Sequence, residues 1–107
     1  MRLEPTVTPF DPDTYVAQLK SVKAVGHEEV LVSVGKGGGQ VTMLKLMMRL
    51  KGQSDFRQVG MFTSRTYFDN TPLAQPNIPE EREYQLIAMK KDAPIGQPSP
   101  IMGVMVG

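Results

Sequence analysis

The stretch Thr42–Leu50, TMLKLMMRL, decides the fold class of this chain. Its even positions hold Thr, Leu, Leu, Met and Leu, whereas its odd positions include the charged Lys45 and Arg49. Side chains that alternate with a period of two lie on opposite faces of a β-strand, one face buried and the other facing water. These nine residues therefore predict a half-buried strand. The residues expected on its buried face are Leu44, Leu46 and Met48.

Further short β segments are predicted on both sides of this strand. They are rich in β-branched or alternating apolar residues and are separated by Gly-, Pro- and Asp-rich turns, such as Gly26-His27. No long helical pattern separates them, which favours antiparallel pairing in a sandwich or barrel. The six segments are residues 18–25, 30–34, 56–62, 66–68, 83–90 and 101–106, so seven strands are expected in all.

The N-terminal residues 1–17 are predicted to form an arm outside the sandwich, which would then span residues 18–107. Three prolines occur before residue 13, as in an extended linker. Asp11-Pro12-Asp13 can begin one or two helical turns near residues 12–16. The apolar spacing of Val16, Leu19 and Val22 leaves a longer helix up to Gly26 as the alternative.

Composition excludes several classes of function. The 107 residues carry a net charge of +1, with both signs interspersed, which argues against a nucleic-acid binder. No apolar run is long enough to insert into a membrane, and no signal peptide is recognisable, so a complete chain would be cytoplasmic. Cysteine is absent, so the fold uses no disulfide or thiolate, and the compartment stays undetermined.

The second half of the chain resembles a fibronectin type III domain of the bacterial, immunoglobulin-like type. The resemblance rests on Pro79–Ala88, with Tyr followed by alternating apolar residues, and on Ile95–Pro100 before the final strand. Asp69–Leu73 is similar to the approach to the same corner. The similarity is good from Lys45 to Gly107, extends to about residue 18, and implies a seven-stranded antiparallel β-sandwich.

Two structural residues follow from this resemblance. Tyr84 takes the tyrosine-corner position, where its hydroxyl is expected to bond to the backbone a few residues upstream; a buried Tyr84 without a special partner is the alternative. Val34 takes the place of the family's core Trp, and the chain contains no Trp. The missing volume must come from other side chains. The candidates are Met48, Phe56 and Phe68.

Two motifs suggest chemistry only at first sight. Gly35–Gly39 contains Lys36 before its last glycines and is followed by a strand, whereas a phosphate loop needs Lys after the last Gly and then a helix. A flexible loop is therefore expected. His27 is the only histidine, which leaves no second imidazole or thiolate for zinc. A solvated turn histidine is expected.

The acidic run of Glu80, Glu81 and Glu83 is interrupted by Arg82 and lacks the spaced Asp/Asn/Gly pattern of a calcium loop. A solvated corner is therefore expected here, without a metal. No nucleophile motif accompanies the single histidine. The chain is accordingly predicted to be no enzyme and to use no cofactor.

Methionine is the more informative residue type, with eight in the chain. When Leu44, Leu46, Met48, Tyr84, Leu86 and Ala88 face the core, their neighbours in sequence face outward. An apolar patch on the outer face of an antiparallel sheet usually has a partner, and methionine suits an adaptable contact. The residues predicted to bind a partner are Met43, Met47, Ile87, Met89 and Met105.

The alternative is that Lys45, Arg49, Lys51 and Lys91 screen these methionines, or that the N-terminal arm covers them. With the patch exposed, the expected function is an interaction or spacer module that contacts a protein partner or a second copy; a glycan is a further candidate ligand. The second function considered is an accessory domain of a larger enzyme or surface protein, without chemistry of its own.

Overall fold

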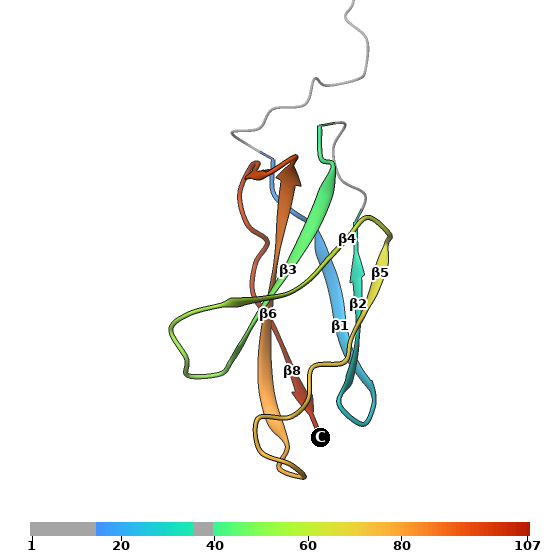
Figure 1. Ribbon diagram of the computed structural model, residues 1–107, viewed down its shortest axis with the longest axis vertical. Helices are drawn as coiled ribbons and strands as arrows, with labels where there is room; N and C mark the ends of the chain where they lie inside the picture. The colour runs from blue at the N-terminus through green and yellow to red at the C-terminus, as the bar shows by residue number, and fades with distance from the viewer. Residues whose placement is uncertain (1–14, 36–39) are drawn as a thin grey trace, which may run out of the picture.

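The computed structural model describes residues 15–35 and 40–107, and within them the chain is all-β. Eight strands follow one another along the chain and build two antiparallel sheets (Figure 1). The strands are β1 (Leu19–Gly26), β2 (Glu29–Val34), β3 (Met43–Leu50), β4 (Arg57–Phe62), β5 (Thr66–Asp69), β6 (Glu80–Lys90), β7 (Ala93–Pro94) and β8 (Met102–Val106).

The smaller sheet has the order β1-β2-β5. The larger sheet has the order β4-β3-β6-β7, and β8 pairs with β6 beside β7. The seven predicted strands are all present, and the two-residue β7 is added by the turn after β6, where Met89 lies opposite Pro94. The immunoglobulin-like or fibronectin type III sandwich predicted from the sequence is therefore confirmed.

The start of the sandwich differs from one of the predictions. The helix considered up to Gly26 is wrong, because Leu19–Gly26 is a strand paired with β2. Residues 12–14 lie outside the described ranges, and Val16 forms a parallel bridge with Gln97 instead of a helical turn. Ala17 donates its N–H to the Gln97 carbonyl at 3.1 Å and is buried in the core. The segment before residue 18 thus packs onto the sandwich from Tyr15 onward.

The core lies between the inward faces of the two sheets and follows the predicted alternation. Leu44, Leu46 and Met48 from β3 are buried, and Tyr84, Leu86 and Ala88 from β6 are completely buried. The smaller sheet contributes Val30, Val32 and Val34. The burial patterns of β2 and β3 alternate residue by residue, as a strand with one buried face requires.

The volume of the absent Trp is supplied in part by residues other than those predicted. Val34 faces the core and Met48 is buried as expected. Phe68 is 51% exposed, because its neighbours Tyr67 and Asp69 take the inward positions of β5. Phe56 lies under the Arg49 guanidinium, 4.4 Å from its ring centre. The aromatic pair that fills the edge of the core is instead Phe62 stacked on Tyr67, with ring centres 4.9 Å apart.

Leu46→Ala tests the assigned core. Leu46 is completely buried in the central strand β3, so its truncation is expected to lower the free energy of unfolding by about 2–5 kcal/mol. Urea denaturation measures this loss. The control is Lys20→Ala on the exposed side of β1, with an expected change within about 0.5 kcal/mol. A Leu46→Ala loss no larger than that of the control would contradict the assignment.

Candidate functional site

The outer face of the larger sheet brings most of the predicted contact residues together. In the β3–β6 ladder Met43 lies opposite Met89, and Lys45 lies opposite Ile87. In the β3–β4 ladder Lys45 lies opposite Met61. Residues directly opposite or diagonal to one another across antiparallel strands are close enough for their side chains to touch. We call this surface the methionine face; its residues are Met43, Met47, Met61, Ile87 and Met89.

Exposure divides the methionine face into accessible and inaccessible members. Met61 is 42% exposed, and Met43, Met47 and Ile87 are half-buried. Met89, predicted to be available, is only 4% exposed, because β3 flanks it on one side and β7 on the other. The accessible apolar surface is therefore centred on Met47 and Met61.

Met105 does not join this surface, although it points outward and is 57% exposed. It pairs with Glu81, whereas Ile87 lies six residues further along β6, about 20 Å away in an extended strand. The predicted continuous patch is thus interrupted, and Met105 lies near the opposite end of the sheet. The sequence does not predict Met61 on this face, because residues 56–62 show no clear alternation. Val59 is an extra residue there, and it shifts the pairing between Leu46 and Met47.

Charged side chains separate the methionine face from Met105. Arg49 donates from Nε to Glu83 at 2.8 Å, and Lys51 pairs with Glu81 at 3.6 Å. Arg49 follows Met47 on the same face of β3, so the Arg49–Glu83 pair borders the methionine face, whereas the Lys51–Glu81 pair lies one row further from it. Lys45 is the charged residue that lies within the methionine face, opposite Met61 on one side and Ile87 on the other. It forms no ion pair with any described residue.

A second cluster, made of charged and hydrogen-bonding side chains, lies inside the sandwich at the connection between β5 and β6. Arg82 is completely buried on the inner face of β6, next to Tyr84 in the same row. Its Nε donates to Glu80 at 2.7 Å, and its Nη2 donates to the Thr71 carbonyl at 2.7 Å. Asp69, 2% exposed, lies 3.6 Å from Nη1. We call Asp69, Glu80, Arg82 and Tyr84 the buried corner.

Tyr84 links the two sheets through this corner. Its hydroxyl donates to Asp69 Oδ2 at 2.6 Å, so a residue of the larger sheet bonds to one of the smaller sheet. The upstream partner is therefore a carboxylate, and the backbone bond expected for Tyr84 is not the one formed. Asp69 can take this role because Thr71 saturates its other oxygen, donating from both N and Oγ1.

The environment of the corner shifts two pKa values. Burial raises the pKa of Tyr84, and the hydrogen bond to Asp69 raises it further. Burial alone would lower the pKa of Arg82, but its hydrogen bonds to Tyr84 and Glu80 outweigh that effect and hold it above its ordinary value. Both groups thus keep one protonation state in the fold, which suits a structural role.

The predicted solvated acidic corner is wrong for part of its residues. Glu80 and Arg82 belong to the inner face, where no described buried polar side chain is left without a partner. Glu81 and Glu83 point outward and pair with Lys51 and Arg49. No cluster of three or more metal-binding side chains occurs within residues 15–35 and 40–107.

The remaining sequence motifs divide between exposed and undescribed positions. His27 is exposed in the two-residue turn between β1 and β2. Its neighbour Glu28 accepts a hydrogen bond from the Leu73 N–H at 2.9 Å and so ties this turn to the β5–β6 connection. The glycine motif falls largely on residues 36–39, outside the described part of the chain. No described helix could span a membrane.

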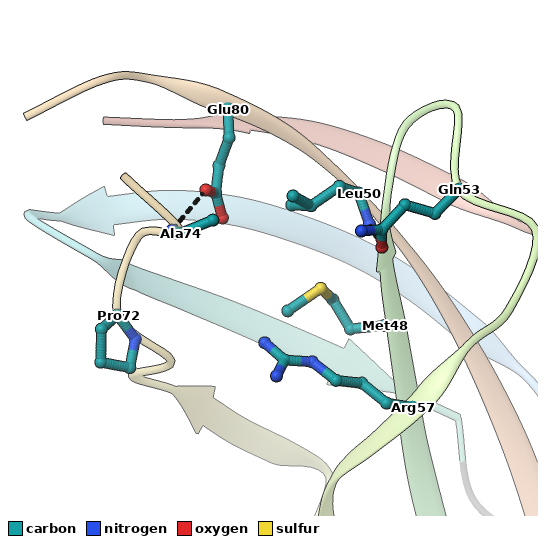
Figure 2. A pocket seen from close by; sticks show the side chains of 7 residues that line it. All are labelled: Met48, Leu50, Gln53, Arg57, Pro72, Ala74 and Glu80. Carbon is teal, nitrogen blue, oxygen red and sulfur yellow. Dashed lines mark hydrogen bonds between the residues drawn. The ribbon is translucent and has the colours of Figure 1, made fainter. Parts of the chain in front are cut away.

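A hollow of about 200 Å³ adjoins the buried corner (Figure 2). One wall comes from the end of β3 and the start of β4, and the other comes from the β5–β6 connection. Glu80 forms part of that second wall and accepts the Ala74 N–H at 2.9 Å, which fixes the connection in place. The lining residues are Met48, Leu50, Gln53, Arg57, Pro72, Ala74 and Glu80.

Comparison with known proteins shows the fold alone. No family model and no curated protein matches this chain. A structure described as titin kinase and its flanking domains is 15% identical, with a TM-score of 0.61 over 88% of this chain. The twitchin kinase region from C. elegans (Fn31-NL-kin-CRD-Ig26) is 13% identical, with a TM-score of 0.68 over 89% of this chain. This chain covers 17% of each, the size of a flanking domain and not of the catalytic part.

Replacing Arg82 tests the role of the buried corner. Arg82→Leu leaves the Asp69 and Glu80 carboxylates buried without their cation, so the free energy of unfolding is expected to fall by about 3–5 kcal/mol. Arg49→Leu, which breaks a partly exposed pair on the next strand, is the control and should cost about 1 kcal/mol or less. Equal losses in urea denaturation would contradict a special role for the corner.

Tyr84→Phe tests the raised pKa. Because folding raises the pKa of Tyr84, its neutral hydroxyl stabilises the fold fully below about pH 10, and this contribution disappears as the pH rises further. At neutral pH the variant should be about 1.5–3 kcal/mol less stable, since the lost bond has a charged acceptor. Thermal unfolding from pH 8 to 12 should show a steeper alkaline loss for the wild type than for the variant. Parallel curves would refute the assignment.

Proposed function

We propose that this domain is a non-catalytic interaction module that binds a protein partner through the methionine face. The observation that carries the proposal is the row formed by Met61, Lys45 and Ile87, with the half-buried Met43 and Met47 on either side of Lys45 along β3. The solvent face of an antiparallel sheet is normally polar, so an apolar group of this kind favours a contact surface. Flexible thioether side chains adapt to a partner's shape.

Lys45 indicates the chemistry of that partner. It is the charged residue within the methionine face, and it has no ionic partner among the described residues. In a two-fold symmetric dimer centred on this surface, Lys45 would face its own copy, and like charges would oppose association. A different protein that presents a carboxylate among apolar side chains is therefore the favoured partner.

A second candidate function is an accessory domain within a larger protein. The supporting observation is that the titin and twitchin structures named above are kinase regions with flanking domains, and this chain covers 17% of each. An accessory domain would use the same surface to contact its neighbour in the chain. In the first function the partner is a separate protein, and in the second it is another domain of the same chain. The contact residues are the same in both.

The test replaces accessible members of the methionine face with lysine. Met47→Lys combined with Met61→Lys is expected to abolish partner capture from the source cell while leaving the thermal midpoint of unfolding nearly unchanged. Met89 is unsuitable, because it is buried. Met105→Lys is the matched control, since it makes the same change on the same sheet outside the methionine face.

Quantitative mass spectrometry of the captured proteins, with light scattering of the purified domain, gives the readout. A partner kept by Met105→Lys and lost by the double variant supports the proposal. If the domain is a dimer in solution and the double variant is a monomer, the partner is a second copy of this chain and not a different protein. A partner retained by the double variant would show that the methionine face is not the contact surface.

A further inference from the structure

A groove at the edge of the sandwich carries a different kind of binding chemistry from the methionine face. The hollow beside the buried corner continues into a second one, also about 200 Å³, through the shared walls of Leu50, Ala74 and Glu80. The second hollow is closed by Gln75, Pro79 and the 52% exposed Ile78. The groove is therefore apolar at its Ile78 end and polar at its Arg57 end.

The acceptors that line this groove are already engaged. Glu80 accepts from Ala74 N with one oxygen and from Arg82 Nε with the other. Gln53 Oε1 accepts the Leu50 N–H at 3.0 Å, and the Pro72 carbonyl accepts from Arg82 Nη2 at 3.3 Å. A ligand that enters the groove therefore meets few free acceptors.

Two hydrogen-bond donors that line the groove have, in contrast, no partner among the described residues. Arg57 lies opposite Met48 in the β3–β4 ladder, so it shares the inner face and borders the hollow (Figure 2). Its guanidinium has no hydrogen-bond or ion-pair partner within residues 15–35 and 40–107, and the same holds for the amide nitrogen of Gln53. Glu80, the one carboxylate in the lining, is opposed by Arg82 at 2.7 Å. The free polar groups thus match an anion.

We propose that this groove binds an acidic peptide segment of a partner protein, with a carboxylate on Arg57 and an adjacent apolar side chain between Leu50 and Ile78. A guanidinium pairs with a carboxylate through two parallel hydrogen bonds. Each hollow is smaller than the roughly 300–1,000 Å³ of sites for drug-sized ligands, and one side chain of a peptide suits that size. The groove is separate from the methionine face, so this inference is independent of the function proposed above.

The test begins with selection of displayed random seven-residue peptides on the immobilised domain. The selected peptides are expected to combine Asp or Glu with a nearby Leu, Ile, Val, Met or Phe. A synthetic fluorescent copy of the strongest binder is then titrated by anisotropy. Arg57→Gln should weaken its binding about tenfold or more, and the peptide with its carboxylate changed to the amide should weaken equally.

Two controls make the outcome decisive. Arg65→Gln removes an exposed arginine at the β4–β5 turn, outside the groove, and should leave the affinity unchanged. Circular dichroism should show the same fold for both variants. Selection of peptides without a carboxylate, or unchanged affinity in Arg57→Gln, would overturn the proposal. Loss of binding in the Met47→Lys, Met61→Lys variant with retention in Arg57→Gln would place the peptide on the methionine face instead.

Discussion

The completely buried guanidinium of Arg82 is the constraint around which the sandwich is organised at the connection between β5 and β6. A buried cation is tolerated only when it is paired and its hydrogen bonds are satisfied. Glu80 and Asp69 provide the charges, and the Thr71 and Pro72 carbonyls accept further hydrogen bonds. Because these partners come from β5, β6 and the connection between them, satisfying one side chain fixes the path of the chain over this whole corner.

The same corner couples the two sheets and shapes the groove. The Tyr84–Asp69 bond joins β6 of the larger sheet to β5 of the smaller one, in addition to the apolar contacts between them. Glu80 bonds to Arg82 on one side and to Ala74 on the other, so the wall of the groove is held by the group that neutralises the buried cation. A rigid wall loses little conformational freedom when a ligand binds to it.

The two candidate surfaces lie on different faces of the larger sheet and use different chemistry. The methionine face is an outward, adaptable apolar surface that includes Lys45, a cation without an ionic partner in the part of the chain that the structure describes. The groove lies at the inner edge, where Arg57 borders the hollow beside Met48 and Leu50. A domain that carries both surfaces can bind two segments of one partner. Once the first segment is bound, the second is held near its own site at a high effective concentration, which strengthens the overall binding.

The amino-acid sequence by itself determined the strands, their inward residues and hence the sandwich, because the alternation in residues 42–50 and 83–90 is local and has only one way to bury its apolar side. It also placed Met43, Met47 and Ile87 outward. Only the tertiary structure decided which of these are accessible: Met89 is enclosed by β3 and β7, Met105 lies at the far end, and Met61 joins through a bulge at Val59. The burial of Arg82 depended on the tertiary structure in the same way, because the groups that stabilise a buried charge come from distant parts of the chain, and no short-range pattern records how they meet.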